Sequence, residues 1–153
     1  MDRAALLGRI QTAWETLEKS YAGLSDAQLT ELAVSGDWSV KEILAHVTTW
    51  EEESLKYLPV IIEGGRPPRY ARFGGIDAFN ATMTAQKRGL SLADVRQQMG
   101  DVHGKLIDFL QGVPEGQFTR ETRFRRRLRL DTYRHYLEHA RAIRDWRAGR
   151  SVE

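Results

Sequence analysis

The chain has 153 residues and a formal net charge of +2; 41% of the residues are hydrophobic and 29% are charged. These values are typical of a globular protein, and the length predicts one domain over residues 1–153. The absence of cysteine excludes disulfide bonds, thiolate metal ligands and cysteine nucleophiles. No apolar run reaches the roughly 18–20 residues of a transmembrane helix, and the acidic, amphipathic start argues against a signal peptide. We therefore expect a cytoplasmic protein without a membrane partner.

The first half of the chain has the apolar spacing of two long helices joined by a short one. Apolar residues recur at steps of three and four over residues 2–22, which predicts an amphipathic helix. A capping-box sequence that starts at Ser25 predicts a short helix to about residue 33. A second capping box, Ser39 with Glu42, opens the second long helix, which should end by residues 63–65.

The second half of the chain contains two further long helices. Glycines and prolines predict a loop over residues 64–75, and a short helix is expected over 76–87. The third long helix is predicted over 91–113. The arginine-rich segment 121–129 is interpreted as a solvated loop, and a last helix is predicted over 131–149 with its first residue, an aspartate, as the cap. Four long helices without a strand predict an all-α fold: an antiparallel four-helix bundle with short extra helices in the connections.

Three of the four histidines fall on helix faces that are predicted to point inward. His135 and His139 are four residues apart on the last helix, so both rings lie on one face, one turn apart. His46 lies on the apolar face of the second long helix. Three neutral imidazoles can bind a divalent cation and leave a coordination position open for water or substrate. The pattern predicts a metal site, and the alternative is three hydrogen-bonded histidines in the core.

Two segments resemble the signatures of a known family. Residues 38–47, followed by Trp50, resemble the second-helix signature of the DinB-like superfamily, and residues 132–143 resemble its last-helix signature. The stretch over 79–114 has the spacing of the ClbS/DfsB-like branch of four-helix-bundle proteins. The resemblance implies an antiparallel four-helix bundle, often a homodimer, in which three histidines hold nickel or zinc. Carried onto this sequence, those ligands are His46, His135 and His139.

The resemblance also implies a class of activity. Members of the superfamily carry out metal-dependent transfers or isomerisations with low-molecular-weight thiols, whereas ClbS-type relatives hydrolyse a strained ring and do not all keep the histidines. Because this chain keeps all three, we expect a metal-dependent hydrolase or thiol-dependent transferase or isomerase that acts on a small molecule. Two alternatives stay open: a non-catalytic protein that sequesters a small toxic compound, and a scaffold dimer.

Several other residues are candidates for the site. Aromatic side chains on the histidine-bearing helices are predicted pocket residues, with core packing as the alternative: Trp50, Tyr57 and Tyr136. Carboxylates near the histidines are candidates to orient a ligand or to act as a general base, with a solvated helix face as the alternative: Glu42, Glu53 and Glu138. His103 is expected to be partly exposed and without a role in the site.

Two arginine clusters suggest anion binding. The run from Arg123 to Arg129 invites comparison with phosphate-binding segments, but it contains one aromatic residue and no known readout motif. We therefore expect no nucleic-acid partner. In the loop over 64–75, the arginines at 66, 69 and 72 are candidates to receive a substrate carboxylate or phosphate.

Overall fold

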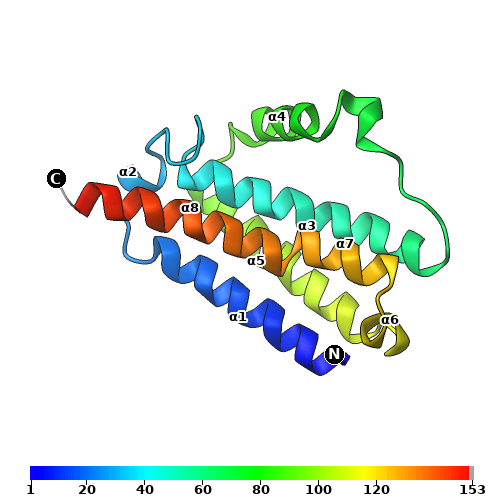
Figure 1. Ribbon diagram of the computed structural model, residues 1–153. Coiled ribbons are helices and arrows are strands. Elements are labelled where there is room, and N and C mark those ends of the chain that lie inside the picture. The colour runs from blue at the N-terminus through cyan, green and yellow to red at the C-terminus, as the bar shows by residue number, and fades with distance from the viewer. Residues whose placement is uncertain (152–153) are drawn as a thin grey trace.

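The computed structural model describes residues 1–151, and four long helices pack side by side in it (Figure 1). The long helices are α1 (Arg3–Tyr21), α3 (Val40–Ile62), α5 (Leu92–Gln111) and α8 (Tyr133–Ser151). The shorter elements are α2 (Asp26–Leu29), the 3-10 turn η1 (Tyr70–Phe73), α4 (Ile76–Lys87), α6 (Gly116–Thr119) and α7 (Arg123–Asp131). The described residues contain no strand beyond one isolated bridge between Ser35 and Trp38. The predicted all-α four-helix bundle is confirmed.

The long helices form two pairs that run in opposite directions. α1 and α8 run one way, and α3 and α5 run the other way (Figure 1). This order is possible because the chain does not turn directly from α3 into α5. It crosses back along the bundle through η1 and α4, which lie outside α3 (Figure 1). The long connection therefore supplies a separate layer that covers one face of α3.

Local signals explain where the two longest predicted helices begin. The Ser39 hydroxyl accepts a hydrogen bond from the Glu42 backbone, and the Glu42 carboxylate accepts one from the Ser39 backbone, so the expected capping box is present. At α5, the Ser91 hydroxyl accepts from the backbone of Asp94. The short helix α4 has the bounds that the sequence predicts.

The interpretation of residues 121–129 as a solvated loop is wrong. Residues Arg123–Asp131 form α7, and the Thr122 hydroxyl caps it by accepting from the backbone of Arg125. Phe124 and Leu128 are four residues apart and fully buried. This single apolar pair places one face of α7 against the core, while the arginines between them occupy the other faces.

The predicted helix cap at Asp131 is also wrong. Asp131 is the last residue of α7, and its carboxylate is buried rather than bonded to a helix N-terminus. Thr132, with φ −121° and ψ −105°, separates α7 from α8, so the two helices follow one another with a break between them.

One hydrophobic core runs through the bundle. Its fully buried side chains come from all the long helices and from α7, and include Leu6, Ile10, Ile43, Leu106, Leu128 and Ile143. None of the described helices is both long enough and apolar enough to cross a bilayer.

Candidate metal centre

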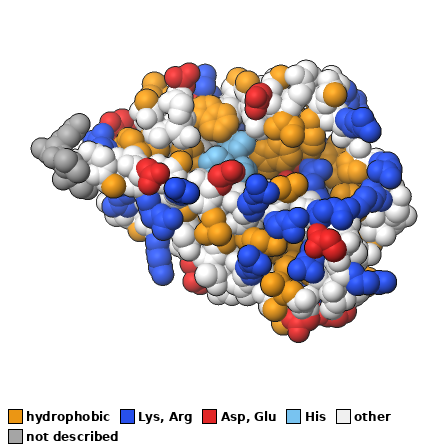
Figure 2. Space-filling view, in the orientation of Figure 1, with side chains coloured by type: hydrophobic (Ala, Val, Ile, Leu, Met, Phe, Trp, Pro, Cys, Tyr) orange, Lys and Arg blue, Asp and Glu red, His pale blue; other side chains and the backbone are white. Residues whose placement is uncertain are grey.

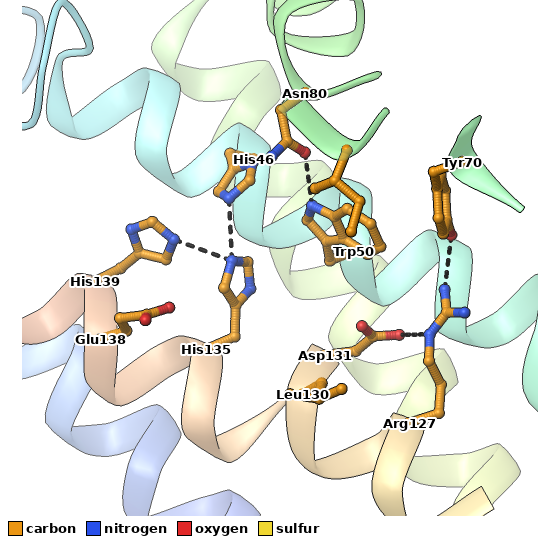
Figure 3. A pocket seen from close by; sticks show the side chains of 11 residues that line it. His46, Trp50, Tyr70, Asn80, Arg127, Leu130, Asp131, His135, Glu138 and His139 are labelled. Atoms are coloured by element: carbon orange, nitrogen blue, oxygen red, sulfur yellow. Dashed lines mark hydrogen bonds and ion pairs between the residues drawn. The ribbon is translucent and has the colours of Figure 1, made fainter. Parts of the chain in front are cut away.

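The three predicted histidines meet between α3 and α8 (Figure 3). The Nε2 atom of His135 lies 3.0 Å from Nε2 of His46 and 3.0 Å from Nε2 of His139. The possible ligand atoms of the three rings all lie within 4.8 Å of one another. His46 is buried, and the two α8 histidines are half-buried. Residues 89 positions apart in the sequence thus form one cluster with three nitrogen atoms at its centre.

The geometry fits a bound cation better than it fits hydrogen bonds alone. A neutral imidazole has one N–H and one lone pair, so a given ring nitrogen carries either a hydrogen or a lone pair. Nε2 of His135 therefore cannot form two full hydrogen bonds, although it faces two other Nε2 atoms at 3.0 Å. A cation that accepts all three lone pairs satisfies every one of these contacts.

The environment keeps the three rings neutral. Burial, together with His139 and Lys87, lowers the pKa of His46 to about 3. Burial and the two neighbouring rings lower the pKa of His135 to about 2, and burial alone lowers that of His139 to about 4. At neutral pH all three side chains are therefore uncharged, each with one N–H and one lone pair, and this neutral form is the one that binds a metal.

The cluster lies in the wall of a cavity of about 510 Å³. In the space-filling view, the pale-blue histidines lie in a hollow bordered by hydrophobic side chains and, on one side, by arginines and lysines (Figure 2). Besides the histidines, the lining residues are Trp50, Tyr70, Ile76, Asn80, Arg127, Leu130, Asp131 and Glu138. A volume of this size is suited to a small molecule.

A partly buried polar network forms the end of the cavity away from the histidines (Figure 3). The Arg127 guanidinium donates from Nε to Asp131 Oδ2 at 2.6 Å and from Nη2 to the Tyr70 hydroxyl at 2.7 Å. The Tyr70 hydroxyl donates in turn to Glu53 at 3.0 Å, and the Ser54 hydroxyl donates to Asp131 Oδ2 at 2.7 Å. These contacts join α3, η1 and α7, so the crossover connection helps to build the cavity wall.

The predicted aromatic pocket residues have different positions. Trp50 lines the cavity, and its indole N–H donates to the Asn80 side chain at 2.9 Å. Tyr136 is fully buried and donates to Glu51 at 2.7 Å, on the core side of α8. Tyr57 is half-buried, and its ring lies 6.0 Å from the Arg127 guanidinium carbon. Neither Tyr57 nor Tyr136 belongs to the described residues that line the cavity.

The three candidate carboxylates also differ in position, and only one of them lines the cavity. Glu138 lines the cavity from an exposed position beside His139. Glu53 does not line the cavity. It accepts a hydrogen bond from Tyr70, which does. Glu42 belongs to the cap of α3 and pairs with Arg88 at 2.9 Å, outside the cavity.

Sequence reasoning missed Tyr70, Asn80, Arg127 and Asp131. Asp131 precedes His135 by four residues, a spacing that indicates a shared helix face. The other three depend on how the crossover and α7 pack. The loop arginines proposed to receive an anion, at 66, 69 and 72, are exposed and are absent from the described cavity wall.

Solved structures of similar fold place the chain among known proteins. The structure described as "Sibling Lethal Factor Precursor - DfsB" aligns with a TM-score of 0.80 and 15% identity, over 98% of this chain and 97% of that one. The colibactin self-resistance protein ClbS aligns with a TM-score of 0.79 and 12% identity, over 95% of both chains. An uncharacterised protein from Escherichia coli UTI89 aligns with a TM-score of 0.75 and 13% identity, over 98% and 95% of the two chains. None of the curated proteins matches the sequence.

The ClbS structure corrects the expectation that a nucleic-acid partner can be excluded for this chain. ClbS was solved in complex with double-stranded DNA. A protein of this fold therefore binds nucleic acid, and the expected exclusion of such partners was wrong. The sequence profile of the DinB superfamily matches residues 9–142, most of the helical bundle and all three clustered histidines, and the chain belongs to the DinB superfamily.

Proposed function

We propose that this protein is a metal-dependent enzyme that acts on a small molecule, with His46, His135 and His139 as ligands of one divalent cation. The observation that carries this proposal is the convergence of three neutral imidazole nitrogens in the wall of a cavity. Zinc and nickel are the proposed metals, because both bind imidazole nitrogen well. When bound, such an ion acts as a Lewis acid toward a water, a thiol or a carbonyl group.

The side chains of the cavity are suited to hold a substrate beside the histidines. Trp50, Ile76 and Leu130 offer an apolar surface. On the polar side, the Asn80 amide is fixed by Trp50, and the Arg127 guanidinium is fixed by Asp131 and Tyr70. Both polar groups are held before a ligand arrives, which lowers the entropic cost of binding. The proposed reaction is a hydrolysis or a transfer or isomerisation that uses a low-molecular-weight thiol.

Metal analysis tests the proposal directly. Protein without a polyhistidine tag, purified without a nickel column, is titrated with zinc and with nickel, and the bound metal is measured by mass spectrometry. We expect about one ion per chain. His46→Ala and His139→Ala should each lower the affinity by about tenfold or more, because each removes a ligand.

His103→Ala is the matched control, since it removes the one histidine outside the cluster. This variant should bind the metal as the wild type does. A folded wild-type protein that takes up neither zinc nor nickel contradicts the proposal, as does a His139→Ala variant with wild-type affinity.

A second candidate is a protein that sequesters a small toxic compound without turnover. The similar fold of ClbS, described as a self-resistance protein, supports this alternative. The two functions differ in stoichiometry. Protection that stops at one compound per chain, and that survives His139→Ala, favours sequestration, whereas accumulation of product beyond one equivalent favours the enzyme.

A further inference from the structure

Asp131 presents one unpaired carboxylate oxygen to the cavity. Its Oδ2 atom accepts hydrogen bonds from Ser54 at 2.7 Å and from Arg127 at 2.6 Å. Among the described residues, no group donates to Oδ1. The side chain is only 6% exposed, yet the residue lines the cavity, and its carboxylate lies between Arg127 and His135 (Figure 3). The single free oxygen of a buried acid therefore faces the space where a ligand would lie.

The two bonds to Oδ2 fix the direction of the free oxygen. Ser54 belongs to α3 and Arg127 to α7, so the carboxylate is held from two sides and cannot turn freely. Burial raises the pKa of Asp131 although Arg127 lowers it. A buried carboxylate with a raised pKa accepts a proton more readily than an exposed one.

The other carboxylates near the cavity lack this combination. Glu138 is exposed on the rim, where water solvates it. Glu53 is buried, but one oxygen accepts from Tyr70 and the other pairs with Lys56 at 3.3 Å. Asp131 is thus the carboxylate of the described cavity wall that is both desolvated and incompletely bonded.

We propose that Asp131 is the proton acceptor of this cavity, taking the proton of a thiol or hydroxyl group on the bound small molecule. This inference rests on the proposed function and names the chemical class of the substrate or co-substrate. The S–H or O–H bond breaks, its electron pair stays on sulfur or oxygen, and the proton moves to Oδ1. Arg127 keeps its positive charge, and the new anion replaces the aspartate charge beside it.

The structure indicates what the remainder of such a ligand should be like. The cavity that Asp131 lines also contains the apolar side chains of Trp50, Leu130 and Ile76. An ionisable thiol or alcohol with a short apolar body therefore matches the cavity, because its X–H group can reach Oδ1 while its carbon atoms cover apolar side chains.

Cobalt-loaded protein and two sulfur probes test this role. A sulfur anion that binds cobalt(II) produces a charge-transfer absorption band, which gives a dissociation constant without any turnover. At pH 7, 2-mercaptoethanol must lose a proton in order to bind as an anion, whereas thioacetate is already ionised. We expect Asp131→Asn to weaken 2-mercaptoethanol binding by about tenfold or more, since only a few per cent of an ordinary thiol is ionised at pH 7. Thioacetate binding should not weaken.

Two further variants separate proton transfer from structural damage. Asp145→Asn removes an exposed carboxylate of α8 that does not line the cavity and should leave both probes unchanged. Asp131→Glu keeps a carboxylate and should retain more 2-mercaptoethanol binding than Asp131→Asn. Equal weakening of both probes in Asp131→Asn, or no weakening of either, overturns the inference. A wild-type protein that takes up none of zinc, nickel and cobalt instead overturns the proposed metal site, on which the inference rests.

Discussion

At the residue scale, the site depends on imidazoles that the fold holds in the neutral form. His46, His135 and His139 have pKa values lowered to about 3, 2 and 4, mainly by burial. In the unfolded chain an ordinary histidine has a pKa of about 6.5. Below that pH the unfolded state therefore binds more protons than the folded state, and acid favours unfolding.

The metal-free protein should consequently lose stability as the pH falls. The contribution of the three histidines is fully present above about pH 7 and is lost progressively from about pH 6.5 toward the folded pKa values near 4 and below. Urea unfolding of EDTA-treated protein at pH 7.5 and pH 5.0 measures this difference. His135→Leu, which removes one of the three groups, should flatten the pH dependence. A free energy of unfolding that rises on acidification would contradict the expectation.

At the scale of the element, the start of α3 sets the rotation and position of the helix that carries His46, Trp50 and Glu51. Ser39 and Glu42, which form the capping box, are both buried. The Glu42 carboxylate also pairs with Arg88. α8 follows α7 directly in the chain, and Thr132, with its non-helical backbone, separates the two helices. The two ligand-bearing helices thus begin differently: α3 begins at a side-chain cap, whereas α8 begins one residue after the end of α7.

Ser39→Ala should destabilise the protein by about 1 kcal/mol, because it leaves a backbone N–H of the first turn without its acceptor. Urea unfolding at neutral pH measures the loss. Thr12→Ala is a suitable comparison, since that hydroxyl bonds to a carbonyl of an exposed part of α1 and caps nothing. The comparison variant should change the free energy of unfolding by less than about 0.5 kcal/mol. Equal effects of the two substitutions would argue against a special role of the cap.

At the scale of the whole molecule, the four long helices meet in one buried polar cluster. Glu51 of α3 is fully buried, and its Oε2 atom lies 2.7 Å from His103 Nδ1 of α5 and accepts from Tyr136 of α8 at 2.7 Å. Trp14 of α1 stacks on the His103 ring, with centroids 3.6 Å apart and an interplanar angle of 7°. The histidine that the sequence leaves without a role thus connects the two opposed helix pairs.

His103→Ala should lower the free energy of unfolding by about 1–3 kcal/mol, because it deprives the buried Glu51 carboxylate of one of its two partners. The same substitution should leave metal affinity unchanged, since His103 lies outside the ligand cluster. Thermal or urea unfolding, combined with the metal titration, checks both expectations. Lys105→Ala, an exposed change on the same helix, should have little effect on either quantity. Wild-type stability in His103→Ala would show that the cluster contributes nothing.

The sequence predicts helix bounds, which depend on neighbouring residues, better than it predicts contacts between distant segments. Caps and apolar spacing act within a few residues, so the bounds of α3, α4 and α5 follow closely from the chain itself. α7 is the exception, because five arginines between residues 123 and 129 hide the apolar pair Phe124 and Leu128. Tyr136 shows a finer limit. It follows His135 directly, but a rotation of about 100° per residue turns it into the core while His135 faces the cavity.

The sequence by itself determined the all-helical bundle and the three inward histidines, because helical periodicity decides which face a side chain occupies. Only the tertiary structure decided which side chains lie opposite the three histidines in the cavity. The crossover brings Tyr70 and Asn80 to the cavity, where they contact Arg127 and Trp50, and the packing of α7 on α3 joins Asp131 to Ser54. These contacts span tens of residues, and no local spacing encodes them. For the same physical reason, the candidate metal ligands followed from the sequence, whereas the candidate proton acceptor emerged only from the folded chain.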